Sequence, residues 1–350
     1  MERMQEKAGR ALMVGIQGTS LDDETREALE HLRPVGVILF RRNLETPQEL
    51  AALLSDLHRH LRPPTLLALD QEGGRVSRLE PWIGPTPPAA ELAVTGGEAA
   101  FHFGRATALG LRSLGFNLNF APVVDLCDPA ASNGIGNRSW GPDAQVASQL
   151  AGSFLDGLQQ AGVAGCLKHF PGLGDSQVDS HQHLPTVWRD QRRLEEEDLL
   201  PYRLLGGRAA SVMVGHGHYP SLDSEPGLPA TLSTTIVRTW LRDRMGFKGL
   251  VVTDDMEMGA VAPLDDGGRA AVAAVAAGCD LVLYCSDLER ASRARDALQK
   301  AAGDDPAFAA RLERAVKTVN QTAARWPTPR PDLEAWKAAR QEIWEASRPA

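Results

Sequence analysis

The sequence predicts a (β/α)8 barrel of the TIM type, and two features of the chain favour this α/β fold class. Short apolar runs alternate with longer amphipathic stretches along the chain, which is the pattern of repeated strand–helix units around a parallel sheet. We count about eight such runs, the number that closes this barrel. An open doubly wound sheet is the alternative, but no G-x-G-x-x-G motif follows an early run to support a dinucleotide site there.

The apolar runs are too short, and too rich in leucine or β-branched residues, to form helices alone. We therefore expect strands over residues 11–16, 35–40, 66–69, 117–124, 163–167, 211–214, 250–252 and 281–284.

Helices are expected between these strands. The clearest one begins at Thr46, a capping residue, and Pro47, which suits the first turn of a helix. Others are expected over residues 98–114, 142–160, 192–205, 234–244 and 269–277, and two more after the last strand. No internal repeat or linker interrupts the pattern. We expect one catalytic barrel domain over residues 1–350, with peripheral C-terminal helices from about residue 305.

Composition excludes several classes of protein. The 37 basic and 45 acidic residues give a net charge of −8 with no basic block, so we expect no nucleic-acid partner. The longest apolar stretch, residues 270–279, is too short to cross a bilayer. Glu2 and Glu6 precede an apolar run of six residues, which does not fit a signal peptide, so a cytoplasmic location and no membrane partner are expected. The four cysteines lack metal or disulfide spacing.

Polar residues follow most of the expected strands, where catalytic groups of such barrels gather. They are Asp70, Asp125, Lys168, His169, His216, Asp254 and Asp255. The connections over residues 125–142 and 169–189 are long for a compact barrel, and long loops of this kind usually carry function.

The second of these loops contains the segment KHFPGLGD, residues 168–175, followed by DSHQHLP, residues 179–185. Asp179 lies two residues before His181. A nearby carboxylate accepts an imidazole N–H, fixes the tautomer and raises the basicity of the ring. We therefore expect His181 to act as a general acid and base.

Two other segments supply carboxylates and cations. The strand over residues 250–252 leads to Asp254 and Asp255, and a carboxylate at such an end can attack an anomeric carbon. Strand alternation lets only one of the two face the substrate, so the other should bond to backbone or arginine. In LDQEGGRVSR, Asp70 and Arg78 suit the vicinal hydroxyls of a sugar. Arg138 and Trp140 would add a donor and an aromatic platform.

Together, the segments LDQEGGRVSR, FNLNFAPVVDL, GNRSWGPD, KHFPGLGDSQVDSHQHLP and VVTDDMEM resemble the β-N-acetylhexosaminidases of glycoside hydrolase family 3, of the NagZ type, over about residues 36–286. The resemblance implies that Asp254 is the nucleophile and that His181, polarised by Asp179, is the acid/base. It also implies that the sugar hydroxyls are held by Asp70, Arg78, Arg138, Lys168 and His169.

The resemblance further implies a retaining exo-β-N-acetylglucosaminidase that needs no metal or cofactor. Its substrate would be a small saccharide, N-acetylglucosamine linked to anhydro-N-acetylmuramic acid in peptidoglycan fragments, and its role would be cell-wall recycling. A monomer is favoured. One departure is Leu173, where the family pattern KHFPGHGD has a second histidine. The change affects the expected substrate selectivity rather than the core chemistry.

Three other functions are compatible with the same residues. A β-N-acetylglucosaminide phosphorylase would use phosphate in place of water. A metal hydrolase would use the H-x-H pairs His181/His183 and His216/His218. A carbohydrate-binding protein would bind saccharide without turnover.

Overall fold

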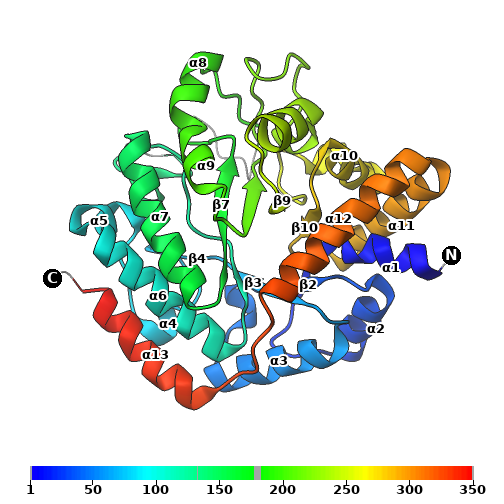
Figure 1. Cartoon of the computed structure of the whole chain (residues 1–350). Coiled ribbons are helices and arrows are strands. Elements are labelled where there is room, and N and C mark those ends of the chain that lie inside the picture. Colours follow the sequence, from blue (N-terminus) through cyan, green and yellow to red (C-terminus); the bar gives the residue numbers. More distant parts are fainter. Residues whose placement is uncertain (1, 132, 177–182, 349–350) are drawn as a thin grey trace.

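The computed structural model describes residues 2–131, 133–176 and 183–348, and its centre is a closed barrel of parallel strands (Figure 1). Around the barrel, the strands follow the order β1 (Leu12–Gly15), β10 (Leu281–Tyr284), β9 (Leu250–Asp255), β8 (Ser211–Val214), β7 (Ala164–Phe170), β6 (Leu118–Asn119), β3 (Leu66–Leu69) and β2 (Gly36–Ile38). The predicted (β/α)8 barrel is confirmed.

Residues along each strand alternate between two hydrophobic clusters. In β1, Met13 belongs to the cluster inside the barrel, whereas Leu12 and Val14 pack outward against the helices. In β10, Leu283 points inward and Val282 outward. Both faces of the sheet are therefore covered, which explains why these strands read as continuous apolar runs in the sequence.

Helices surround the barrel (Figure 1). They are α1 (Glu2–Arg10), α2 (Asp23–Leu32), α3 (Pro47–His60), α4 (Glu80–Ile83), α5 (Ala89–Thr95), α6 (Gly97–Leu114), α7 (Ala144–Gln160), α8 (Gln191–Arg193), α9 (Leu200–Leu205), α10 (Arg269–Ala277), α11 (Leu288–Asp304), α12 (Pro306–Arg325) and α13 (Leu333–Ala346). Two π-helical segments, Leu194–Asp198 and Thr235–Arg244, and short 3-10 turns such as Arg41–Asn43 and Gly136–Arg138 complete the shell.

Capping residues place the helix starts where the sequence predicts them. The Thr46 hydroxyl accepts the backbone N–H of Glu49 at the start of α3, and the Asp143 carboxylate accepts that of Val146 in α7. Each side chain satisfies a backbone donor that the first turn of the helix leaves without a partner. After the barrel, α12 contributes Val319 to the inner cluster, and α13 packs along α6 (Figure 1).

Among the differences from the sequence prediction, three concern elements near the site. Strand β6 ends at Asn119 instead of 124, because Pro122 has no N–H to donate to a neighbouring strand. The helix expected over 192–205 is broken by the π-helical turn Leu194–Asp198, and α9 begins with Pro201 in its first turn. A hairpin of β4 (Gln71–Gly73) and β5 (Val76–Ser77) stands where only a Gly-Gly turn was expected. No helix in the described ranges has the length and apolarity to cross a membrane.

Candidate active site

A cavity of about 550 Å³ opens at the carboxyl ends of the barrel strands. Six of the predicted site residues line it: Asp70, Arg78, Arg138, Lys168, His169 and Asp254. The other two, Asp179 and His181, lie outside the described residues. The strand ends therefore bring together side chains that are up to about 180 positions apart in the chain, as a parallel barrel requires.

One wall of the cavity is a chain of alternating positive and negative side chains. The Lys168 ammonium contacts Asp70 Oδ1 at 2.9 Å and Glu72 Oε1 at 2.7 Å. Glu72 also accepts two hydrogen bonds of 2.8 Å from Nε and Nη2 of Arg138. Arg78 Nη2 lies 3.2 Å from Asp70 Oδ2. Each carboxylate is thus held between two cations, and its orientation is fixed before any ligand binds.

Asn119 positions the two acids of this wall. It ends β6, and its side-chain amide accepts the backbone N–H of Gln71 and donates to the Gln71 carbonyl, both at 2.9 Å. The backbone between Asp70 and Glu72 is thereby tied to the neighbouring strand. This contact sets the start of the β4–β5 hairpin and holds the carboxylates on either side of Gln71 toward Lys168.

The same cations keep these acids ionised. Burial would raise the pKa of Asp70, but Lys168 and Arg78 outweigh it and hold that pKa below its usual range. Burial opposes the ionised form of Glu72 as well, and Arg138 and Lys168 lower its pKa. Desolvation would lower the pKa of Lys168, whereas Asp70 and Glu72 raise it. At neutral pH, this wall presents fixed charges to donors and acceptors of a polar ligand.

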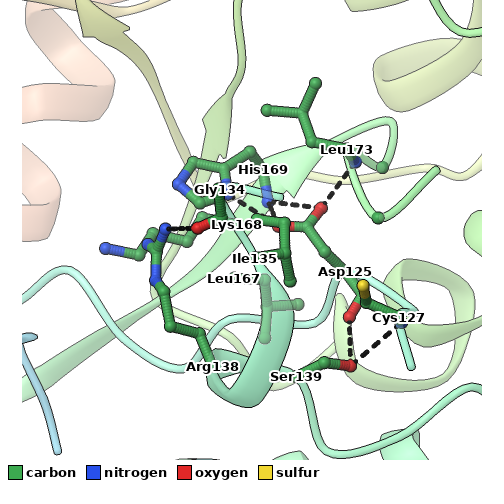
Figure 2. A network of polar contacts seen from close by, with 12 residues as sticks. Asp125, Cys127, Gly134, Ile135, Arg138, Ser139, Leu167, Lys168, His169 and Leu173 are labelled. Carbon is green, nitrogen blue, oxygen red and sulfur yellow. Dashed lines mark hydrogen bonds and ion pairs between the residues drawn. The ribbon is translucent and has the colours of Figure 1, made fainter. Parts of the chain in front are cut away.

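A buried carboxylate orients His169 (Figure 2). The ring nitrogen Nδ1 of His169 lies 2.7 Å from Asp125 Oδ2, and the backbone N–H groups of His169 and Leu173 donate to the same carboxylate at 3.2 and 2.8 Å. Because the carboxylate accepts from Nδ1, the Nε2 atom is left for the cavity that His169 lines. Asp125 also fixes the first turn of the loop that leads to Leu173.

The loop that carries Arg138 is held by its own polar side chains. Ser139 donates to the Asp125 carbonyl at 2.7 Å and accepts the N–H of Cys127 at 3.1 Å (Figure 2). Asn133 accepts the N–H groups of Ile135 and Gly136. Trp140, expected as a platform for sugar, is instead buried against Phe154, with ring centroids 6.1 Å apart. That expectation was wrong, because the side chain packs behind the loop rather than toward the cavity.

Asp254 and Asp255 both line the cavity, whereas alternation predicted only one of them there. The cause is a bulge in the pairing of β9 with β10: Val252 pairs with Leu281, but Asp255 pairs with Leu283, so β9 holds one extra residue. Both carboxylates accept backbone N–H groups, so the expected division between them is not found: Asp255 Oδ1 accepts those of Glu257 at 3.0 Å and Cys285 at 3.3 Å, and Asp254 accepts that of Asp255.

Asp254 differs from the acids of the charged wall. Its Oδ1 accepts the N–H of Asp255 at 2.9 Å, and no Lys, Arg or His in the described part of the chain forms an ion pair with it. A carboxylate at a cavity wall without a neutralising cation keeps its lone pairs available for an electrophilic carbon. This property suits the nucleophile that the sequence predicts at this position.

Two acids of the site were not assigned a role from the sequence. Asp125 stands at the end of the run FAPVVD, and Glu72 stands two residues after Asp70. The sequence signals for them are the strand-end position of Asp125 and the i, i+2 spacing around Gln71, but the partners of both acids come from distant parts of the chain. The second histidine pair is also explained: His216 hydrogen-bonds to Thr231 and to the Asp255 carbonyl, and His218 contacts Thr186 and Gly227. These contacts engage both ring nitrogens, which argues against the metal-hydrolase alternative at this pair.

Comparisons with known proteins agree with this geometry. The family model of the glycosyl hydrolase family 3 N-terminal domain matches residues 3–321. A beta-hexosaminidase of Pseudomonas aeruginosa is 37% identical over 292 residues, which cover 83% of this chain and 86% of that protein. One from Thioalkalivibrio sulfidiphilus is 37% identical over 340 residues, covering 95% of each chain.

A solved structure supports the same relationship. The glycoside hydrolase family 3 beta-N-acetylglucosaminidase of Paenibacillus sp. str. FPU-7 superposes with a TM-score of 0.87 at 34% identity, and the match covers 98% of this chain and 68% of that chain. These relatives support hydrolysis of hexosaminides and give no support to the phosphorylase alternative.

Proposed function

The chain belongs to glycosyl hydrolase family 3 and is a β-N-acetylhexosaminidase, and on that premise we propose that it releases terminal β-linked N-acetylglucosamine with retention of the anomeric configuration. The observation that carries the proposal is the position of Asp254, a carboxylate without a cationic partner in the described chain, opposite a wall of paired ions. The paired ions suit the hydroxyls of a sugar, and Asp254 suits its anomeric carbon.

In the proposed mechanism, an Asp254 oxygen forms a bond to the anomeric carbon as the bond to the leaving oxygen breaks. His181, held by Asp179, gives a proton to that oxygen and later takes one from the water that releases the sugar. These two roles come from the sequence motif, since both residues lie outside the described ranges. A neutral imidazole avoids the repulsion that a second carboxylate would exert on the nucleophile.

The charged wall contributes binding and orientation. Asp70, Arg78, Arg138, Lys168 and His169 are proposed to hold the sugar hydroxyls. Because Lys168 and the arginines are already held by carboxylates, these side chains do not have to reorient when the sugar binds. The natural substrate is proposed to be a peptidoglycan fragment that ends in N-acetylglucosamine, handled by a monomer in the cytoplasm during cell-wall recycling.

Hydrolysis of nitrophenyl glycosides tests the proposed function. We expect the enzyme to release nitrophenol from the β-N-acetylglucosaminide at least about 100-fold faster than from the β-glucoside, because a site built to bind a polar substituent rejects an analogue that lacks it. Proton NMR of early product should show the β-anomer. In phosphate buffer the product should be free sugar. Sugar phosphate, or α-anomer as the first product, would contradict the proposal.

The His181→Ala variant tests the acid/base assignment. We expect a small loss of kcat/KM for a dinitrophenyl glycoside and a loss of about 10²–10⁴-fold for an alkyl glycoside, since general acid catalysis matters most for a poor leaving group. A His183→Ala variant, which changes an exposed histidine two positions away, serves as the control. Equal losses for both leaving groups in His181→Ala would remove the assignment.

A further inference from the structure

Asp255 is a second carboxyl group on the cavity wall without a cationic partner in the described chain. The bulge in β9 turns it toward the cavity beside Asp254. Its Oδ1 atom accepts two backbone N–H groups, from Glu257 and Cys285, while Oδ2 has no hydrogen-bond partner among the described residues. One oxygen is therefore fixed by the backbone, and the other is available to a ligand.

The groups around Asp255 oppose a negative charge there. Asp254 precedes it in β9, and the Glu257 carboxylate lies on the turn that follows. Strand β10 contributes Leu283, and the residue after the strand is the buried Cys285, whose thiol pKa is raised by burial. After β8, the chain reaches His216, whose Nε2 atom hydrogen-bonds to the backbone carbonyl of Asp255. Arg42, the nearby cation, donates to the carbonyls of Cys285 and Ile16.

These contacts distinguish Asp255 from the acids of the opposite wall. Asp70 and Glu72 are each held by two cations, so their ionised forms are stabilised. Asp255 has two backbone donors and two carboxylate neighbours instead. Burial, Glu257 and Asp254 raise the pKa of Asp255 to about 7. Below that pH the neutral acid predominates, and Oδ2 can carry a proton.

We propose that Asp255 is a substrate-binding residue that stays an un-ionised carboxylic acid and donates an O–H hydrogen bond to a hydroxyl or ring oxygen of the sugar that Asp254 attacks. The inference rests on the proposed function of the cavity. An un-ionised neighbour leaves the negative charge on Asp254, where the nucleophile needs it, and it supplies a hydrogen-bond donor to a cavity whose lining also includes the apolar side chains of Met213, Met258 and Leu283. No proton leaves Asp255 during turnover.

Ionisation of Asp255 should make sugar binding weaker at high pH. The binding form of Asp255 is the protonated one, so affinity for the sugar should be nearly full at about pH 6 and below, and should fall as pH rises through about 7. For a single group with that pKa, the protonated fraction falls about tenfold between pH 6 and pH 8. Calorimetric titration with N-acetylglucosamine, which involves no chemical step, measures this dependence.

Three variants separate the proton on Asp255 from other effects. Asp255→Asn keeps the shape and a hydrogen-bond donor but cannot ionise. Its Kd at pH 6 should therefore stay within about threefold of the wild-type value, and its Kd should not increase toward pH 8 as that of the wild type does. Asp255→Ala removes the donor and should weaken binding at every pH. Glu257→Gln removes a neighbouring negative charge that lies outside the cavity, and it should shift the pH at which sugar affinity is lost.

The direction for Glu257→Gln is fixed by electrostatics. A carboxylate near Asp255 disfavours its ionised form, so removing that charge lowers the pKa of Asp255 and shifts the loss of affinity to lower pH. A glutamine can keep the existing contacts, because Glu257 Oε1 accepts the N–H groups of Ser286 and Asp287, and Oε2 contacts the Ser286 hydroxyl, to which an amide nitrogen can donate. Thermal unfolding of each variant verifies that the fold is intact.

Different results would contradict the role of Asp255 and the proposed function of the cavity. A folded Asp255→Asn enzyme that binds sugar as weakly as Asp255→Ala, or that retains the wild-type pH dependence, would overturn the inference about Asp255. Hydrolysis of the nitrophenyl glycoside by the wild type at pH 6 reports separately on the proposed function. An active wild type with an inactive asparagine variant therefore refutes only the role of Asp255, whereas an inactive wild type refutes both proposals.

Discussion

Replacing Asp254 with alanine is expected to lower kcat for the nitrophenyl β-N-acetylglucosaminide by about 10⁴-fold or more, the size of loss found when a group acting in covalent catalysis is removed. The physical reason is that the anomeric carbon loses the only attacking atom that the proposed mechanism supplies. Binding of N-acetylglucosamine should change much less, since the charged wall around Lys168 remains. Stopped assays of nitrophenol release and calorimetry of sugar binding measure the two quantities.

Adding azide to the Asp254→Ala variant tests directly whether Asp254 is the nucleophile. In Asp254→Ala, the small anion can enter the space left by the carboxylate, form a bond to the anomeric carbon and displace nitrophenolate. Attack from that side gives the α-glycosyl azide. Asp128→Ala, which changes an exposed aspartate on the loop after Asp125, is the matched control and should keep wild-type rates. A β-azide product, or normal turnover without azide, would show that Asp254 is not the nucleophile.

The barrel itself was predictable because strand and helix patterns are local. The bounds of β3, β8 and β10 agree with the apolar runs from which they were predicted, and Asp70 and Gly215 mark the ends of the first two. The end of β9 was not predictable to the same degree. Its bulge depends on pairing with β10, a strand about 30 positions later, and only that pairing turns both Asp254 and Asp255 toward the cavity.

The site shows the same division between local and distant information. Strand-end position was sufficient to nominate Asp70, Lys168 and His169. It could not reveal that Glu72 joins Lys168 to Arg138, or that Asp125 orients His169, because each contact joins segments that are more than 40 positions apart in the chain. The sequence motif around Trp140 suggested an aromatic platform for a sugar. The structure shows that the Trp140 ring is buried against Phe154, which the motif alone does not indicate.

Lys168→Met should have the largest effect on stability. The Lys168 side chain is 3% exposed and lies between two carboxylates that are 15% and 7% exposed. Removing one partner of a buried ionic cluster costs about 3–5 kcal/mol, because the remaining charges stay desolvated. Urea denaturation at pH 7 should show this loss in the free energy of unfolding. Lys317→Met, which changes an exposed lysine of α12, should be within about 0.5 kcal/mol of the wild type.

The loss in unfolding free energy caused by Lys168→Met should become smaller in acid and smaller when Asp70 is also replaced. In the wild type, the pKa values of Asp70 and Glu72 are lowered, so their contribution to stability is present above the unfolded pKa and is lost as pH falls through the folded pKa. Without the lysine, both pKa values rise, so acid neutralises the repelling carboxylates of the variant before those of the wild type, and the difference in unfolding free energy between them narrows as pH falls through the raised pKa values. Adding Asp70→Asn removes one of the two carboxylates that have lost the lysine, and the double variant should be more stable than the sum of the single losses predicts. Additive losses, or a penalty that grows in acid, would mean that packing of the lysine side chain and not its charge holds this wall together.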